Sequence, residues 1–144
     1  MNLCNIKRTF ELKPLRKWDT LYVLIDVHGV IIPGSWHKAN DFRFISEDCL
    51  PVLQWFTKRK DIKLILWTSS YTSEIVGIIE WLQKHGITVD YVNRNPECQN
   101  TTYADFEHKP YFNILIDDKA GFEPKTDWNE IKMQLIEIGE WDKV

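Results

Sequence analysis

Two runs of consecutive apolar residues stand out in the hydrophobic pattern of this chain, and each of them ends in acidic residues. Short apolar runs rich in β-branched and aromatic types, with no polar alternation, are typical of parallel strands buried on both faces. The pattern therefore predicts strands over 21–26 and about 112–117. The first ends in Asp26 and the second in Asp117 and Asp118.

Between these runs the period of the apolar positions changes back and forth, which predicts alternating helices and strands. Capping residues, glycines and prolines mark the expected ends of these elements. In chain order we expect a helix from Ser46 or Asp48 to about Lys60, a strand over 62–67, a helix over about 73–85 stopped by Gly86, a strand over 87–93, an irregular segment over 94–110, and a last helix starting at the capping-box pattern Asp127–Glu130.

This order of elements predicts an α/β fold with a doubly wound, mostly parallel, Rossmannoid sheet and right-handed crossovers. A length of 144 residues suits one domain with one core, covering residues 1–144. Residues 1–20 show no clean periodicity, so we expect a lead-in segment packed on the edge of the sheet.

The net charge of −3 supplies no basic field that would hold a nucleic acid non-specifically. The lead-in segment 1–20 is locally basic, and a solvated segment is the favoured interpretation, while a nucleic-acid partner stays open. Its basic residues are Lys7, Arg8, Lys13, Arg16 and Lys17.

Cysteine usage and hydropathy indicate the compartment. Cys4, Cys49 and Cys98 are odd in number and lack CxxC spacing, which favours a reducing environment over disulfides or a zinc site. Cys49 falls in a helical pattern and is expected in the core. The apolar run 21–33 is interrupted by polar residues and is too short to span a bilayer, and no signal-peptide pattern opens the chain. We expect a cytoplasmic protein without a membrane partner.

Chemistry-bearing residues fall where the predicted strands end. The carboxyl edge of such a sheet would gather Asp26, Thr68, Asp117 and Asp118, and Lys109 enters just before the last strand. A carboxylate can attack phosphorus, and two further acids can hold Mg²⁺. A hydroxyl and an ammonium group can stabilise the charge on a transferring phosphoryl group.

The chain resembles the haloacid dehalogenase (HAD) superfamily of phosphohydrolases. Four segments that resemble its motifs occur in order: IDVHGV with the nucleophile, LILWT with the hydroxyl, HKP with the lysine, and LIDD with the paired acids. The resemblance covers the chain from about Tyr22 to its end and is strongest to small bacterial hydrolase-like members. It implies a Mg²⁺-dependent phosphatase that works through an aspartyl-phosphate.

The resemblance also implies roles for individual positions. Asp26 would be the nucleophile, and Thr68 and Lys109 would grip the phosphoryl group, with Ser69 beside them. Trp36, in the loop after the nucleophile, would line the substrate pocket. The metal ligands would be Asp26, Asp117, Asp118 and the main-chain carbonyl of His28.

The chain departs from the family pattern at His28, where the phosphatases carry a second aspartate as general acid/base. Imidazole titrates near neutrality and can donate a proton, so His28 can replace that acid. Alternatively the proton relay is lost, and the domain is a catalytically weakened phosphate-binding, metal-binding or protein-interaction module. Both readings stay open, and a receiver-like phosphorelay domain is disfavoured because its acid pair belongs on the first strand.

Simpler structural roles compete for the other residues. Thr68 and Ser69 also suit a turn or helix cap, and Lys109 also suits a solvated surface, with His108 and Lys119 as rivals. The spacing between the motifs leaves no room for a cap domain. By resemblance, a capless member acts on a large or protruding phosphorylated substrate, such as the end of a nucleic acid, protein or sugar, or borrows a neighbouring subunit as a lid.

Overall fold

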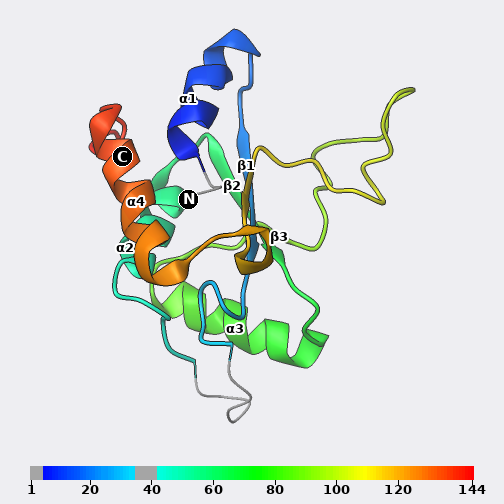
Figure 1. Ribbon diagram of the computed structural model, residues 1–144. Helices are drawn as coiled ribbons and strands as arrows, with labels where there is room; N and C mark the ends of the chain where they lie inside the picture. Colours follow the sequence, from blue (N-terminus) through cyan, green and yellow to red (C-terminus); the bar gives the residue numbers. More distant parts are fainter. Residues whose placement is uncertain (1–4, 35–41) are drawn as a thin grey trace.

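The computed structural model describes residues 5–34 and 42–144, and in them four parallel strands form one sheet flanked by helices (Figure 1). The strand order is β3-β2-β1-β4, so the chain winds outward in one direction from β1 and then returns to its other side. This is the α/β, Rossmann-like arrangement that the alternating pattern predicts. The strands are β1 (Leu21–Asp26), β2 (Ile62–Trp67), β3 (Tyr91–Val92) and β4 (Ile114–Ile116).

The two long central strands match the prediction to the residue. β1 and β2 pair in parallel along their whole length, from Leu21 with Ile62 to Asp26 with Trp67. Both lie between other strands and are buried on both faces, which is why their sequences read as continuous apolar runs.

The outer strands are shorter than predicted because side chains replace part of their ladders. Instead of 87–93, β3 spans only Tyr91–Val92, and the Asp90 carboxylate accepts the Leu64 N–H at 2.8 Å. Instead of 112–117, β4 spans Ile114–Ile116, and Asn113 Oδ1 accepts the Tyr22 N–H at 2.8 Å.

Two helices match their predictions within two residues. Helix α2 spans Cys49–Lys58 and α3 spans Thr72–Lys84. Gly86 follows α3 with a φ of +75°, the left-handed conformation expected at a helix stop. None of the helices in the described residues is long and apolar enough to cross a membrane.

The last helix begins before its predicted cap. Helix α4 spans Pro124–Glu137, with Glu123 rather than Asp127 at the N-cap. The Glu123 side chain accepts the Lys125 N–H, and the Asp127 carboxylate accepts the Glu123 N–H at 2.8 Å. The reciprocal capping pattern therefore exists, but Asp127 is its inner member, already within the helix.

Within the segment 1–20, for which the sequence showed no clean periodicity, residues Ile6–Leu15 form helix α1. Its Ile6 is fully buried, and the Lys7 N–H donates to Gln134 of α4 at 3.0 Å. The buried stripe of α1 is short, so packing on other helices, not periodicity, stabilises it. The Lys7 ammonium pairs with Glu137 at 2.8 Å and the Lys13 ammonium with Asp61 at 3.5 Å, which offsets part of the basic charge of the segment.

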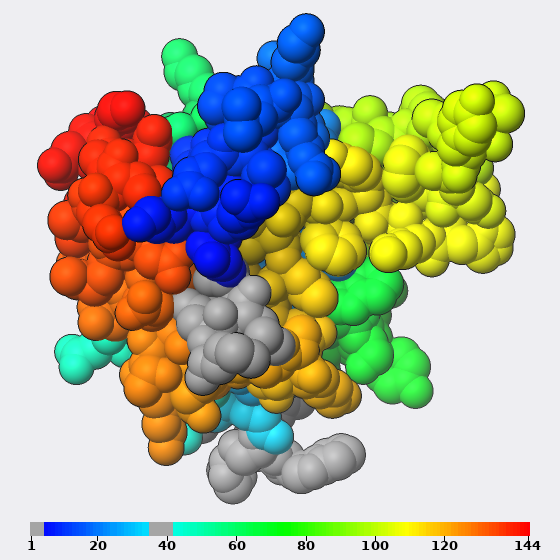
Figure 2. All heavy atoms as spheres, turned by 45° about the horizontal axis from the view of Figure 1, so that its top comes forward, coloured from blue at the N-terminus to red at the C-terminus, as the bar shows by residue number. Residues whose placement is uncertain are grey.

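All four α-helices contribute buried residues to the core on one face of the sheet, together with alternate residues of β1 and β2. The opposite face carries a smaller cluster around Tyr22, Leu24 and Ile65, covered by side chains from the long β3–β4 connection. That connection contains no helix and stands out from the body of the molecule (Figures 1 and 2). Because the winding direction reverses after β3, a right-handed crossover must pass over this second face.

The prediction that Cys49 lies in the core is confirmed. Cys49 is a fully buried free thiol in the core, and burial raises its pKa. Cys98 is also a free thiol, and Cys4 lies outside the described residues.

A partly buried ionic cluster predicts a specific dependence of stability on pH. Arg59 donates to Asp61 at 2.8 and 2.9 Å and to Glu140 at 2.7 Å. The hydrogen bonds from Arg59 lower the pKa of Asp61, although burial opposes this shift. The pKa of Glu140 is also lowered, because the hydrogen bond and charge of Arg59 outweigh the opposing effect of burial. Acids with a depressed folded-state pKa stabilise the protein above their unfolded pKa values, near 4, and lose that effect as the pH falls through the folded values.

Arg59→Met is therefore expected to lower the free energy of unfolding by about 2 kcal/mol at pH 7 and by much less at pH 3. Urea unfolding of both proteins at the two pH values measures this. Lys143→Met is the matched control, because Lys143 contacts the same Glu140 carboxylate at 3.4 Å but is 66% exposed. An equal loss for Arg59→Met at both pH values contradicts the assignment.

Candidate metal and phosphate site

Three carboxylates meet at the carboxyl end of β1 and β4. Asp26 is the last residue of β1, Asp117 follows β4, and Asp118 opens the short 3₁₀ helix η1 (Asp118–Ala120). One oxygen from each carboxylate lies within 4.8 Å of the others. We call these residues the acidic triad; such a set of oxygen atoms can coordinate one divalent cation.

The paired acids are oriented by one backbone amide. The Lys119 N–H donates to Asp117 Oδ1 at 2.9 Å and to Asp118 Oδ1 at 3.0 Å. Asp117 caps η1 in this way. Both carboxylates are thus held by the turn that ends β4.

A glycine allows Asp118 to approach the loop after β1. Gly29 has a φ of +83°, and a Cβ atom at that position would lie 2.6 Å from Asp118 Oδ2. A side chain there would both strain the backbone and displace the carboxylate. The turn is closed by the Ile31 N–H, which donates to the Val27 carbonyl at 2.8 Å, and by the Gly29 N–H, which donates to the Ile32 carbonyl at 2.7 Å.

The electrostatics of the acidic triad favour a positive ligand. Burial, the adjacent Asp118 carboxylate and the charge of Asp117 raise the pKa of Asp26 to about 7, although the hydrogen bond from the Val27 N–H opposes the shift. Three acids so close together repel one another when ionised. A bound cation would relieve that repulsion and hold Asp26 in its ionised form.

The hydroxyl-bearing segment follows the adjacent strand. Thr68 comes directly after β2, whose last residue is the register partner of Asp26. Asn93 holds the Thr68 backbone at both polar groups: its Oδ1 accepts the Thr68 N–H, and its Nδ2 donates to the Thr68 carbonyl, each at 2.8 Å. The Thr68 hydroxyl contacts Ser70 at 3.1 Å, and Ser69 is exposed.

His28 contacts a residue that sequence reasoning missed. Its Nε2 lies 3.0 Å from Glu74 Oε1 in the first turn of α3, with 38% and 34% of the two side chains exposed. The imidazole is thus oriented by a carboxylate from another element. No short motif links the two residues, because they lie on segments that meet only after β1 and β2 pair.

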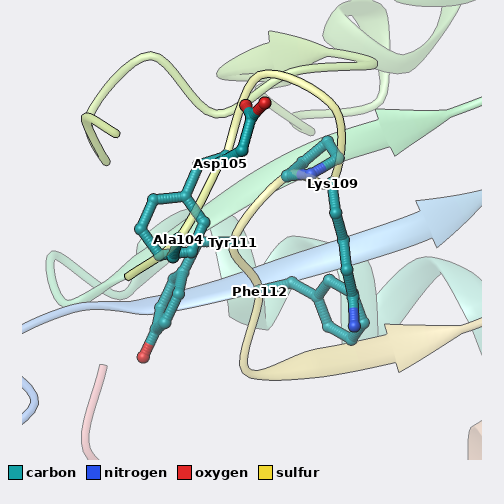
Figure 3. A pocket seen from close by; sticks show the side chains of 7 residues that line it. Ala104, Asp105, Lys109, Tyr111 and Phe112 are labelled. Atoms are coloured by element: carbon teal, nitrogen blue, oxygen red, sulfur yellow. The ribbon is translucent and has the colours of Figure 1, made fainter. Parts of the chain in front are cut away.

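Lys109 lies in a cavity of about 380 Å³ formed by the β3–β4 connection (Figure 3). Tyr111 and Phe112 also line this cavity, and both pack on the sheet face opposite the helices. Among the described residues, Lys109 forms no ion pair or hydrogen bond with the acidic triad, so its role in gripping phosphate stays a prediction. Trp36, the predicted pocket residue, lies outside the described residues.

Comparison with known proteins leaves the chain without an assigned family, since no family model, no curated protein and no solved structure matches it.

Proposed function

We propose that this protein is a Mg²⁺-dependent phosphohydrolase that acts on a phosphomonoester through an aspartyl-phosphate at Asp26. The observation that carries the proposal is the acidic triad, three carboxylates within 4.8 Å at the ends of adjacent strands. Ligands of open α/β sheets bind at this edge, where the winding direction reverses. β1 is that reversal point, because β2 and β4 lie on its two sides.

We also propose that the domain is a capless relative of the HAD superfamily. The four sequence segments that resemble its motifs support this assignment, as does the position of the acidic triad. The described part of the β1–β2 connection contains one helix, α2, and the β2–β3 connection contains α3. In this proposal the site is capless, which suits a phosphate group at the end of a larger molecule.

The proposed reaction has two steps: the first forms an aspartyl-phosphate on Asp26, and the second hydrolyses it. An Asp26 oxygen attacks phosphorus, forming an Asp26–phosphoryl bond while the bond from phosphorus to the leaving oxygen breaks. The leaving oxygen takes up a proton and departs as an alcohol. Water then attacks the aspartyl-phosphate, which releases inorganic phosphate and regenerates the Asp26 carboxylate.

The acidic triad fits a hard divalent cation, since Mg²⁺ prefers a few carboxylates and retains several waters. Asp26, Asp117 and Asp118 would hold it, together with the His28 carbonyl. When bound, it would neutralise charge on the phosphoryl oxygens. Thr68, Ser69 and Lys109 are the proposed donors to those oxygens, and the Asn93 contacts keep the Thr68 backbone in place.

His28 separates this enzyme from the second candidate function. In the enzyme, the imidazole oriented by Glu74 protonates the leaving oxygen. In the alternative, the contact with Glu74 keeps the imidazole from donating a proton to the leaving oxygen. The domain is then a weakened module that binds phosphate, a metal or a partner protein. The assay that tests the proposal measures phosphate release from an aryl phosphate and an alkyl phosphate, with Mg²⁺ and with EDTA.

Phosphate release that requires Mg²⁺ is the expected result, and no release from either substrate contradicts the enzyme. His28→Asp then decides between the two candidates. For the enzyme, this variant is expected to stay within about tenfold of the wild-type rate on the alkyl phosphate, because one proton donor replaces another. For the module, the variant gains turnover that the wild type lacks, and the gain is larger on the alkyl phosphate, whose leaving group needs a proton.

Asp117→Asn tests the metal site without turnover. We expect saturating Mg²⁺ to stabilise the wild type by about 1–3 kcal/mol, and the variant to lose most of that gain. In EDTA the variant should be at least as stable as the wild type, because one of three repelling charges is gone. Thermal unfolding with Mg²⁺ and with EDTA measures both effects, with the exposed Asp142→Asn as a charge-matched control. An unchanged Mg²⁺ response in Asp117→Asn removes Asp117 from the site.

A further inference from the structure

Trp67 is an exposed aromatic residue beside the proposed nucleophile. It is the last residue of β2 and the register partner of Asp26 in β1. Neighbouring strands lie about 4.8 Å apart, so the two side chains start from adjacent positions on the sheet. Trp67 is 38% exposed, whereas Leu66, the residue before it, is fully buried.

The two side chains also leave the same face of the sheet. Successive side chains of a strand alternate between faces. Tyr22 and Leu24 in β1, and Ile65 in β2, form the cluster on the face opposite the helices. Asp26 and Trp67 continue these two alternations, so both project on that face.

The backbone directly after Trp67 is held by a side chain from another segment of the chain. Asn93 binds both polar backbone groups of Thr68, the next residue, at 2.8 Å. Among the residues that the structure describes, no aromatic ring pairs with Trp67, although ten such pairs involve other aromatic side chains. A large apolar ring thus occupies the register position of Asp26 on the neighbouring strand, next to a backbone that Asn93 holds, with part of its surface exposed.

We propose that Trp67 stacks against the base of a nucleotide whose phosphate is bound at the acidic triad. This inference rests on the proposed function and narrows its substrate class to nucleotides. An aromatic platform favours a planar π-face, and base–aromatic stacking tolerates any base. In a nucleotide a ribose separates the base from the phosphate, so a base can reach a ring on the strand next to Asp26 while the phosphate lies at the acidic triad.

Equilibrium binding of AMP, glucose 6-phosphate and glycerol 3-phosphate in the presence of Mg²⁺ tests the proposal, and hydrolysis of the same three compounds is measured in parallel. All three carry a phosphomonoester, but only AMP carries a planar base. We expect the wild type to bind AMP about tenfold more tightly than the other two, the difference that loss of one stacked base typically makes.

Trp67→Leu is expected to lose that preference, and Trp67→Phe to keep most of it, because phenylalanine retains an aromatic face. Trp67→Leu keeps an apolar side chain, and circular dichroism confirms that it is folded. Tyr103→Ala is the control, since Tyr103 is 98% exposed on the projecting β3–β4 connection and should leave the preference unchanged.

Any of three results overturns the inference. The wild type binds AMP and glycerol 3-phosphate equally, it binds glucose 6-phosphate more tightly than AMP, or Trp67→Leu retains the preference for AMP. Each of these results leaves Mg²⁺-dependent hydrolysis, and hence the proposed enzyme, untouched. AMP preference that depends on Trp67 without hydrolysis of any compound supports the nucleotide site and overturns the enzyme.

Discussion

Asp26→Asn is expected to lower phosphate release by roughly 10⁴-fold or more, because an amide of nearly the same shape cannot attack phosphorus. The fold should persist, since the change removes a carboxylate that is costly to ionise: burial and the neighbouring acids raise its pKa to about 7. Steady-state turnover of the wild type and the variant, with Mg²⁺ present, measures the effect. Mass spectrometry of acid-quenched wild-type protein should also detect a phosphoryl group, and Asp26→Asn should lack it.

Two controls separate lost chemistry from lost structure. The free energy of unfolding of Asp26→Asn in EDTA should equal or exceed that of the wild type, because one member of the repelling acidic triad becomes neutral. Asp142→Asn, a change of the same kind at an exposed acid near the end of the chain, should leave turnover within about twofold. Turnover of Asp26→Asn near the wild-type rate rules out covalent catalysis by Asp26.

Trp128→Ala is expected to lower the free energy of unfolding by about 3–5 kcal/mol and the melting temperature by about 10 °C. Trp128 of α4 is fully buried, and its ring packs edge-on against Phe122 with 5.1 Å between the ring centroids. Its Nε1–H donates to the Val30 carbonyl at 2.9 Å. Truncation therefore leaves a cavity and an unpaired buried carbonyl in the loop that follows Asp26.

The effect on the loop is separable from the effect on the core. Trp128→Phe retains a ring but loses the hydrogen bond, so we expect a smaller loss of about 1–2 kcal/mol together with weaker Mg²⁺-dependent stabilisation. Met133→Ala on the same helix, where the methionine is 50% exposed, should change stability by less than about 0.5 kcal/mol. Urea unfolding of the three variants gives these values. A loss below 1 kcal/mol for Trp128→Ala contradicts the role of this side chain in holding the loop.

Long-range side-chain contacts explain much of what sequence reasoning missed. Glu74 reaches His28, Asn93 reaches Thr68, and Trp128 reaches Val30, each across a large separation in the chain. Local spacing carries no signal for such pairs, because each depends on how separately formed helices and strands dock. Of these residues, Asn93 has a φ of +57° in the structure, a conformation that asparagine adopts more readily than most residues.

The shortened edge strands have a related cause. A sequence pattern predicts where a chain can be extended, but the extent of a ladder depends on which backbone groups find partners. Asp90 and Asn113 side chains take those places at the starts of β3 and β4. The helix α1 was missed for the opposite reason: its few buried residues form no clear period, and its stability comes from contact with α4.

By itself, the sequence determined the two central strands, the helices α2 and α3, and the meeting of Asp26 with Asp117 and Asp118. These follow from burial on both faces of β1 and β2 and from the rule that parallel strands end at one edge, which are local or topological constraints. Only the tertiary structure decided that an irregular connection covers the second face, that Glu74 orients His28, and that Trp67 stands exposed beside Asp26. Those features depend on how segments distant in the chain pack together, and the hydrophobic pattern of a single segment does not predict the energy of that packing.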